Sequence, residues 1–214
     1  MRWLSTSLRR LGAVLGVTAQ AASGGCAPAD GTPGKGTLVT DSGMFALWDR
    51  QAFLGVVSFE TWEPELVENE GIERHIRAGH LVPVGIHSDG VFDFAVRVGS
   101  ADAPAVPSER ERRYLTVSSE PYRVRSPGRL HLSGIEYIDA RPDATSVMTI
   151  DVPAGTWAVT VHLLEWDSEP GMKDAQGRPA PAALPDFLLL LNPAAGTERF
   201  RESVETFDMP GGGG

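Results

Sequence analysis

The stretch LVPVGIHSDGVFDFAVRV, residues 81–98, decides the fold. Residues 91–98 alternate large apolar side chains with smaller or charged ones, which is the period of a half-buried β-strand. Ser88-Asp89-Gly90 is a turn sequence and separates this strand from the β-type run Leu81–His87. We therefore predict a β-hairpin here. Leu81–His87 is predicted to be an edge strand, because Pro83 has no N–H to donate to a neighbouring strand.

Similar runs lie on both sides of this stretch. Thr37–Thr40 and Met44–Trp48 flank the turn at residues 41–43, and Val147–Val152 with Thr156–Trp166 is predicted to form another hairpin. Asp186–Leu191 is almost continuously apolar, which predicts a central strand buried on both faces. The other β-type runs are Phe53–Trp62, Arg113–Ser118, Tyr122–Arg125 and Leu130–Ile138.

Helix signals are few. Pro64–Ala78 carries a sparse apolar stripe, and Thr197–Phe207 is a second candidate helix. The sequence thus predicts an all-β, mainly antiparallel fold. It would be a single β-sandwich or barrel-like domain of roughly ten short strands with one or two short helices. Two long connections, Ser100–Arg112 and Ser168–Pro185, are typical of segments that carry function or lack order.

The N-terminal residues differ from this β-rich body. Residues 1–21 are a candidate signal peptide, with three arginines, an apolar run and small residues at a cleavage position after Ala21. Residues 22–36 are rich in Gly, Pro and Ala and are predicted to be a tether. The β-rich domain is predicted over residues 37–209, and residues 210–214 are a glycine tail expected to lack order.

Cys26 is the single cysteine and follows the export-like segment, so its position resembles the lipidated cysteine of bacterial lipoproteins. Ser23 stands where those signals usually have leucine. We expect an extracytoplasmic protein, with a lipid on Cys26 as the one possible contact with a membrane. The alternative is a cytoplasmic protein with a disordered N-terminal extension.

Charge narrows the choice of partner. The chain has 19 basic and 28 acidic residues, a net charge of −9, and four of the basic residues precede Thr37. An acidic body without a Lys/Arg stripe repels phosphate, so nucleic acid is not an expected partner. A protein or small-molecule partner is expected instead, and a basic partner would complement this charge.

Motifs for catalysis and for cofactors are absent from the sequence. No G-x-S-x-G, phosphate-binding glycine loop or thiolate zinc pattern occurs, and the five histidines have no metal-ligand spacing. We therefore predict no catalytic residue, no metal and no cofactor, and we interpret the chain as more consistent with a binding protein than with an enzyme.

Two groups of side chains are candidates for binding. Trp48, Trp62 and Trp166 stand at strand ends beside acidic residues, where an indole can anchor a partner. Residues 60–73 hold six glutamates, of which Glu63, Glu65, Glu68 and Glu70 are the candidate contacts for a basic partner. A solvated surface is the simpler interpretation of such a run.

Three functional hypotheses remain open. The first is an exported or surface-tethered, non-enzymatic bacterial domain that binds a protein or small ligand through strand-end loops. The second is an acidic immunity or inhibitor-type protein that neutralises a basic toxin. The third is a hydrolase whose carboxylates are dispersed along the chain, and the fold class alone does not separate the three.

Overall fold

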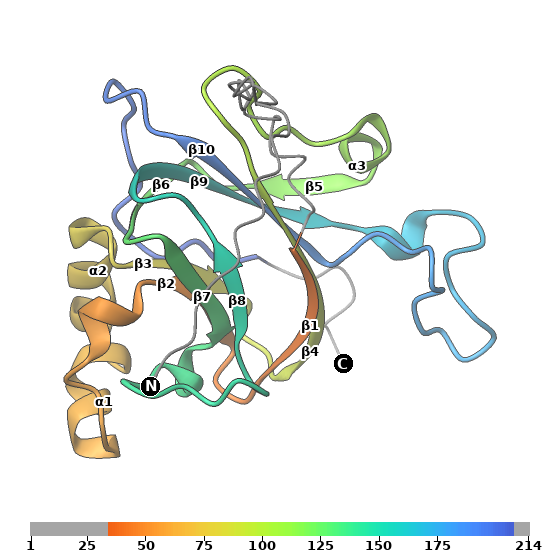
Figure 1. Cartoon of the computed structure of the whole chain (residues 1–214). Helices are drawn as coiled ribbons and strands as arrows, with labels where there is room; N and C mark the ends of the chain where they lie inside the picture. Colours follow the sequence, from red (N-terminus) through yellow and green to blue (C-terminus); the bar gives the residue numbers. More distant parts are fainter. Residues whose placement is uncertain (1–33, 208–214) are drawn as a thin grey trace, which may run out of the picture. The chain divides into compact units, whose positions relative to one another are not determined.

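The computed structural model describes residues 34–207, which form two β-sheets packed face to face with a helical pair at one side (Figure 1). The expected signal peptide, residue Cys26 and the glycine tail lie outside the described residues. Gly34–Gly36, which we expected in the tether, form the start of the first strand.

The larger sheet has six strands, in the order β1-β4-β10-β9-β5, with β6 also paired to β9. All pairs are antiparallel except β4 with β10, which are parallel. The strands of this sheet are β1 (Gly34–Thr40), β4 (Gly90–Val98), β5 (Leu115–Ser118), β6 (Tyr122–Ser126), β9 (Gly155–Leu164) and β10 (Phe187–Pro193).

The smaller sheet has four antiparallel strands in the order β3-β2-β7-β8. Its strands are β2 (Met44–Trp48), β3 (Leu81–Gly85), β7 (Arg129–Gly134) and β8 (Met148–Asp151). The prediction of an all-β, sandwich-like domain of about ten strands is therefore confirmed. The edge position predicted for Leu81–His87 is also confirmed, because β3 ends the smaller sheet.

The predicted hairpins are wrong, although their strands exist. β3 and β4 belong to different sheets, and so do β8 and β9, so the tight turns between them carry the chain across the core. The turn at residues 41–43 does the same between β1 and β2. A short turn fixes only the distance between two strand ends. The strands can then pair with each other or bend apart into facing sheets, where each still buries its apolar face.

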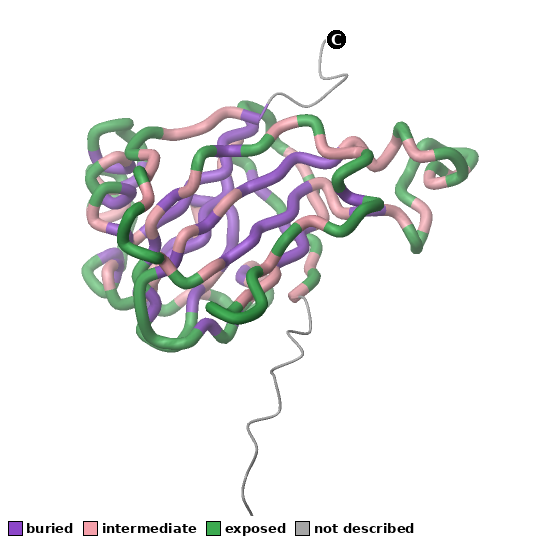
Figure 2. Tube along the Cα trace, turned by 90° about the horizontal axis from the view of Figure 1, so that it is seen from above, coloured by how far each residue is buried: buried purple, intermediate pink, exposed green. Residues whose placement is uncertain are grey.

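The central strand predicted at Asp186–Leu191 is confirmed. β10 lies between β4 and β9, and every residue from Phe187 to Leu191 is buried. Phe187 packs against Phe94 of its own sheet, with ring centroids 5.2 Å apart, and Phe94 packs against Phe45 of the facing sheet at 4.8 Å. Figure 2 shows this burial along the central strands, in contrast to the exposed loop after β9.

The helices lie in the connections between strands. The described residues contain three α-helices and three short 3-10 turns. The helices are α1 (Phe59–Leu66), α2 (Asn69–Ala78) and α3 (Glu109–Arg113), and the turns are η1 (Arg50–Phe53), η2 (Ile135–Tyr137) and η3 (Trp166–Ser168).

The strand predicted at Phe53–Trp62 is wrong, because these residues end η1 and begin α1. The side chain of Asp49 accepts a hydrogen bond from the Gln51 N–H (2.9 Å) and starts η1. The Thr61 hydroxyl accepts from the N–H of Val57 (2.9 Å) and of Ser58 (3.0 Å), at the start of α1. These local bonds satisfy the backbone of the helix start and outweigh the β propensity of the apolar residues.

The predicted helix at Thr197–Phe207 is also wrong. This segment contains no helix and passes from the start of β6 to β3, where Phe207 N–H donates to Gly85 O (2.7 Å). The Tyr122 hydroxyl donates to Ser203 O and accepts from Glu205 N–H, both at 2.9 Å. Burial raises the pKa of Tyr122 to about 12, so the hydroxyl stays neutral and fastens the segment.

The helix predicted over Pro64–Ala78 is two helices, with a close backbone approach at Gly71. A Cβ atom on Gly71 would lie 2.6 Å from Glu65 O and 2.7 Å from Pro64 O. We therefore expect Gly71→Ala to push α1 off α2 and to lower the free energy of unfolding by about 1–3 kcal/mol in urea titrations. Gly55→Ala is the matched control, because nothing lies within 4 Å of its Cβ position. Equal stability of the two variants would contradict this close approach.

Candidate functional site

The two helices in the β2–β3 connection leave a mixed apolar and acidic surface open to solvent. Residues four apart on a helix share a face, so Phe59 and Glu63 of α1 form one exposed stripe with Val67, the residue that caps the helix. Val57, just before the helix, is also exposed. We call the exposed residues Val57, Phe59, Glu63 and Val67, together with the half-buried Trp62, the α1 face.

Phe59 and Trp62 form the centre of this face. The Phe59 side chain is 64% exposed, and its ring stacks on the Trp62 ring with centroids 6.0 Å apart and planes at 25°. The indole N–H of Trp62 donates to Ile135 O at 3.1 Å, which fixes the ring against η2. Folding thus leaves a large aromatic ring in water above a held indole, an arrangement typical of contact sites.

A hollow of about 480 Å³ lies beside the two rings. Val56 and Ile138 supply apolar walls, and Glu136 and Asp139 supply carboxylates. No ion pair involves either carboxylate among residues 34–207. We call this cavity the aromatic hollow.

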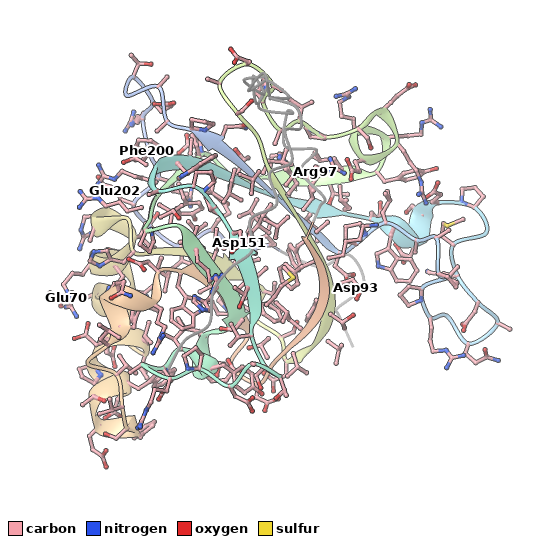
Figure 3. All side chains as sticks on the ribbon, viewed as in Figure 1. Glu70, Asp93, Arg97, Asp151, Phe200 and Glu202 are labelled. Carbon is pink, nitrogen blue, oxygen red and sulfur yellow. The ribbon has the colours of Figure 1, made fainter. Side chains whose placement is uncertain are left out.

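The four candidate glutamates divide into two kinds. Glu63, Glu68 and Glu70 are exposed and have no ion pair within the described part of the chain, and Figure 3 shows Glu70 on the side of the domain formed by α1 and α2. Glu65 instead joins the helices: it accepts from Arg74 at 2.7 Å and lies 2.8 Å from His75 Nε2. The hydrogen bond from Arg74 holds the pKa of Glu65 below its ordinary value.

The three candidate tryptophans lie in separate places. Trp48 is fully buried, with its N–H bonded to Ser133 Oγ at 3.1 Å, so it offers no surface to a partner. Trp166 lines a cavity of about 830 Å³ at the base of the loop after β9, and donates to Asp186 Oδ1 at 2.8 Å. Figure 1 places this loop on the opposite side of the domain from α1, so only Trp62 belongs to the α1 face.

The sequence did not identify three residues of this surface, Phe59, Glu136 and Asp139, as candidates for binding. The three-residue spacing of Phe59 and Trp62 was a helical signal, but it lay inside a run that also fitted a strand. Glu136 and Asp139 reach the hollow only because η2 folds back beside α1 after β7. No local pattern marks such a meeting of distant segments.

One pair of side chains resembles part of a hydrolytic site. Ser118 Oγ lies 2.7 Å from His162 Nδ1, across the β5–β9 pairing. The other ring nitrogen of His162 is buried without a hydrogen-bond partner in the described residues, so no carboxylate orients this imidazole. The pair therefore lacks the third member that activates a serine nucleophile.

No group of three or more His, Cys, Asp or Glu side chains within residues 34–207 is placed to hold a metal ion. No helix in that range is long and apolar enough to cross a membrane.

Comparisons with known proteins give a fold likeness. No family model matches the sequence, and no curated protein sequence matches it. A solved structure described as crocagin biosynthetic gene J covers 75% of this chain and 96% of its own, with 20% identity and a TM-score of 0.50. ComJ from Bacillus subtilis, an inhibitor of the DNA-degrading activity of NucA, covers 75% and 95%, with 13% identity and a TM-score of 0.39. The likeness to the first of these structures shows a shared fold and does not show a shared function.

The buried His75 and the half-buried His80 lie side by side on and just after α2, next to α1. His75 Nδ1 lies 3.4 Å from His80 Nδ1, and burial lowers the pKa of both rings below the ordinary value. A lowered pKa in the folded state means that the unfolded chain binds the protons first. We therefore expect full stability above about pH 6.5 and a falling free energy of unfolding as the pH drops below it.

Urea unfolding at a series of pH values measures this effect. His75→Gln should reduce the loss of stability between neutral and acid pH without removing it, because burial also lowers the pKa of His131 and His162. Val106→Ala, at an exposed side chain that does not titrate, should leave the pH dependence as it is in the unmodified protein. An unchanged pH dependence in His75→Gln would refute the role given to this pair.

Proposed function

We propose that this domain is a non-enzymatic binding protein whose α1 face contacts a basic protein partner. The exposed, stacked ring of Phe59 is the observation that carries the proposal. Burying a large apolar side chain is favourable, and folding does not bury Phe59. Contact with a partner would bury the ring and so contribute this free energy to binding. Aromatic residues in the middle of a surface patch are the usual anchors of protein interfaces.

The charge around the face indicates the kind of partner. Glu63 lies within the face, and Glu68 and Glu70 follow it in the connection to α2 and its first turn. Their carboxylates are exposed and have no ion pair in residues 34–207, so their charge is available to a basic surface. Complementary charge of this kind speeds association and selects the partner.

The position of the face also supports binding through strand ends. Both helices lie in the connection between β2 and β3, so the rigid sandwich presents them without needing them for sheet pairing. Binding residues are commonly carried in this way, on connections held by a rigid scaffold. An inhibitor or immunity-type protein that blocks a basic partner fits this arrangement.

Substitution of Phe59 tests the proposed face. The partner is first identified by photo-crosslinking in the native cells, with benzoylphenylalanine introduced at position 59. Phe59→Ala should then weaken the purified complex by at least about tenfold, the loss typical of a central aromatic anchor, in calorimetric titrations.

Val106→Ala is the matched control, because Val106 is 57% exposed but lies beside α3 rather than α1. It should leave the affinity unchanged, and a crosslinker at position 106 should not capture the same protein. Replacement of Glu63, Glu68 and Glu70 by Gln should slow association and weaken its dependence on salt. A complex that is insensitive to Phe59→Ala and to these three changes would exclude the α1 face as the interface.

We also propose that the protein is exported. The support is the three arginines, the apolar run Leu11–Ala19 and the Ala19-Gln20-Ala21 cleavage pattern. N-terminal sequencing of the native protein should give a chain that begins at Ala22, or at a lipid-modified Cys26 if the lipoprotein route is used. An intact Met1 on the native protein would contradict export by a cleaved signal.

A further inference from the structure

The aromatic hollow is lined by two kinds of group, aromatic rings and carboxylates. Phe59 and Trp62 give it aromatic surface, and Glu136 and Asp139 give it two carboxylates. Its lining residues include no lysine, arginine or histidine. The hollow is therefore negatively charged beside aromatic rings, which is the environment that attracts an organic cation.

The structure holds both carboxylates in place. Glu136 Oε1 accepts from the N–H of Asp41 at 2.8 Å, and Oε2 accepts from the hydroxyl of Thr40 at 3.1 Å. Gly134 allows this position, because a Cβ atom there would lie 2.6 Å from Glu136 Oε1. Asp139 Oδ1 accepts from the N–H of Arg141 at 2.6 Å.

These bonds orient the carboxylates without neutralising them. Every donor to Glu136 and Asp139 just described is an uncharged N–H or O–H group, and each carboxylate oxygen can accept more than one hydrogen bond. Covering the hollow with an apolar side chain would bury two negative charges without a partner, which is costly. An apolar occupant therefore fits the rings but not the carboxylates.

A guanidinium group fits both. It is planar and stacks on aromatic faces, it carries five N–H donors for carboxylates, and its three-carbon stem can lie against Val56 and Ile138. Lysine supplies the charge but not the flat stacking surface or the forked donors. We propose that the aromatic hollow binds an arginine side chain of the partner. This inference rests on the proposed function, since it names the partner group received beside the α1 face.

A small probe tests the hollow apart from any protein partner. Titration of the full chain with N-acetyl-argininamide, followed by NMR, should give saturable millimolar binding with shifts at the Trp62 indole N–H. N-acetyl-citrullinamide has nearly the same shape but no charge, and it should bind at least about tenfold more weakly, because hydrogen bonds between a cation and a carboxylate are stronger than those of a neutral donor. N-acetyl-lysinamide should also bind more weakly than the arginine probe.

Variants then assign the contacts. Glu136→Gln and Asp139→Asn keep the shape of each side chain and should each weaken the arginine probe by about tenfold or more. Phe59→Ala should weaken it as well, and because Phe59 is exposed this variant keeps the core intact. Glu109→Gln, at an exposed glutamate of α3, is the control and should leave binding unchanged. Urea unfolding of each variant shows whether the fold is retained.

Several results would overturn the inference. These are no saturable binding of the arginine probe, equal or tighter binding of the citrulline or lysine probe, and binding that survives both carboxylate variants in folded protein. The proposed function fails by a different result, a partner complex insensitive to changes at Phe59, Glu63, Glu68 and Glu70. A partner that still needs those residues while the arginine probe does not bind would retain the α1 face and exclude the arginine.

Discussion

The burial of β10 on both of its faces is the constraint on which the described domain depends. Phe187, Leu189 and Leu191 point into the main core between the sheets, and Leu188 and Leu190 point into a second apolar cluster on the outer face. Removal of one such side chain from water contributes about 1.5–3 kcal/mol. A single strand thus fixes the middle of the larger sheet and also gives the long loops a surface to pack on.

The path of the chain around this core places the α1 face. The β2–β3 connection starts and ends in the smaller sheet, because β2 and β3 pair with each other there, and β3 also contacts β6 of the larger sheet. α2 packs on β3 and β6, and α1 packs on α2. One side of α1 is therefore buried through Leu66, and its other side, with Phe59, remains in solvent. The exposed aromatic ring follows from the topology rather than from a defect in packing.

Local patterns predicted the strands well but not their partners. The alternation in residues 91–98 and the apolar run after Asp186 each correspond to a strand, since side-chain periodicity depends on neighbours in the chain. Pairing depends on contacts between distant residues. The parallel alignment of Phe187 with Phe94, for example, joins segments 93 positions apart, and no turn signal encodes it.

The sequence by itself determined the β-rich class, the central buried strand and the acidic character of residues 60–73, because composition and periodicity are local properties. Only the tertiary structure decided which of the candidate residues share a site. It buried Trp48, set Trp166 in another cavity, and used Glu65 to join two helices. It also brought Glu136 and Asp139 beside Phe59, because the η2 turn after β7 packs next to α1.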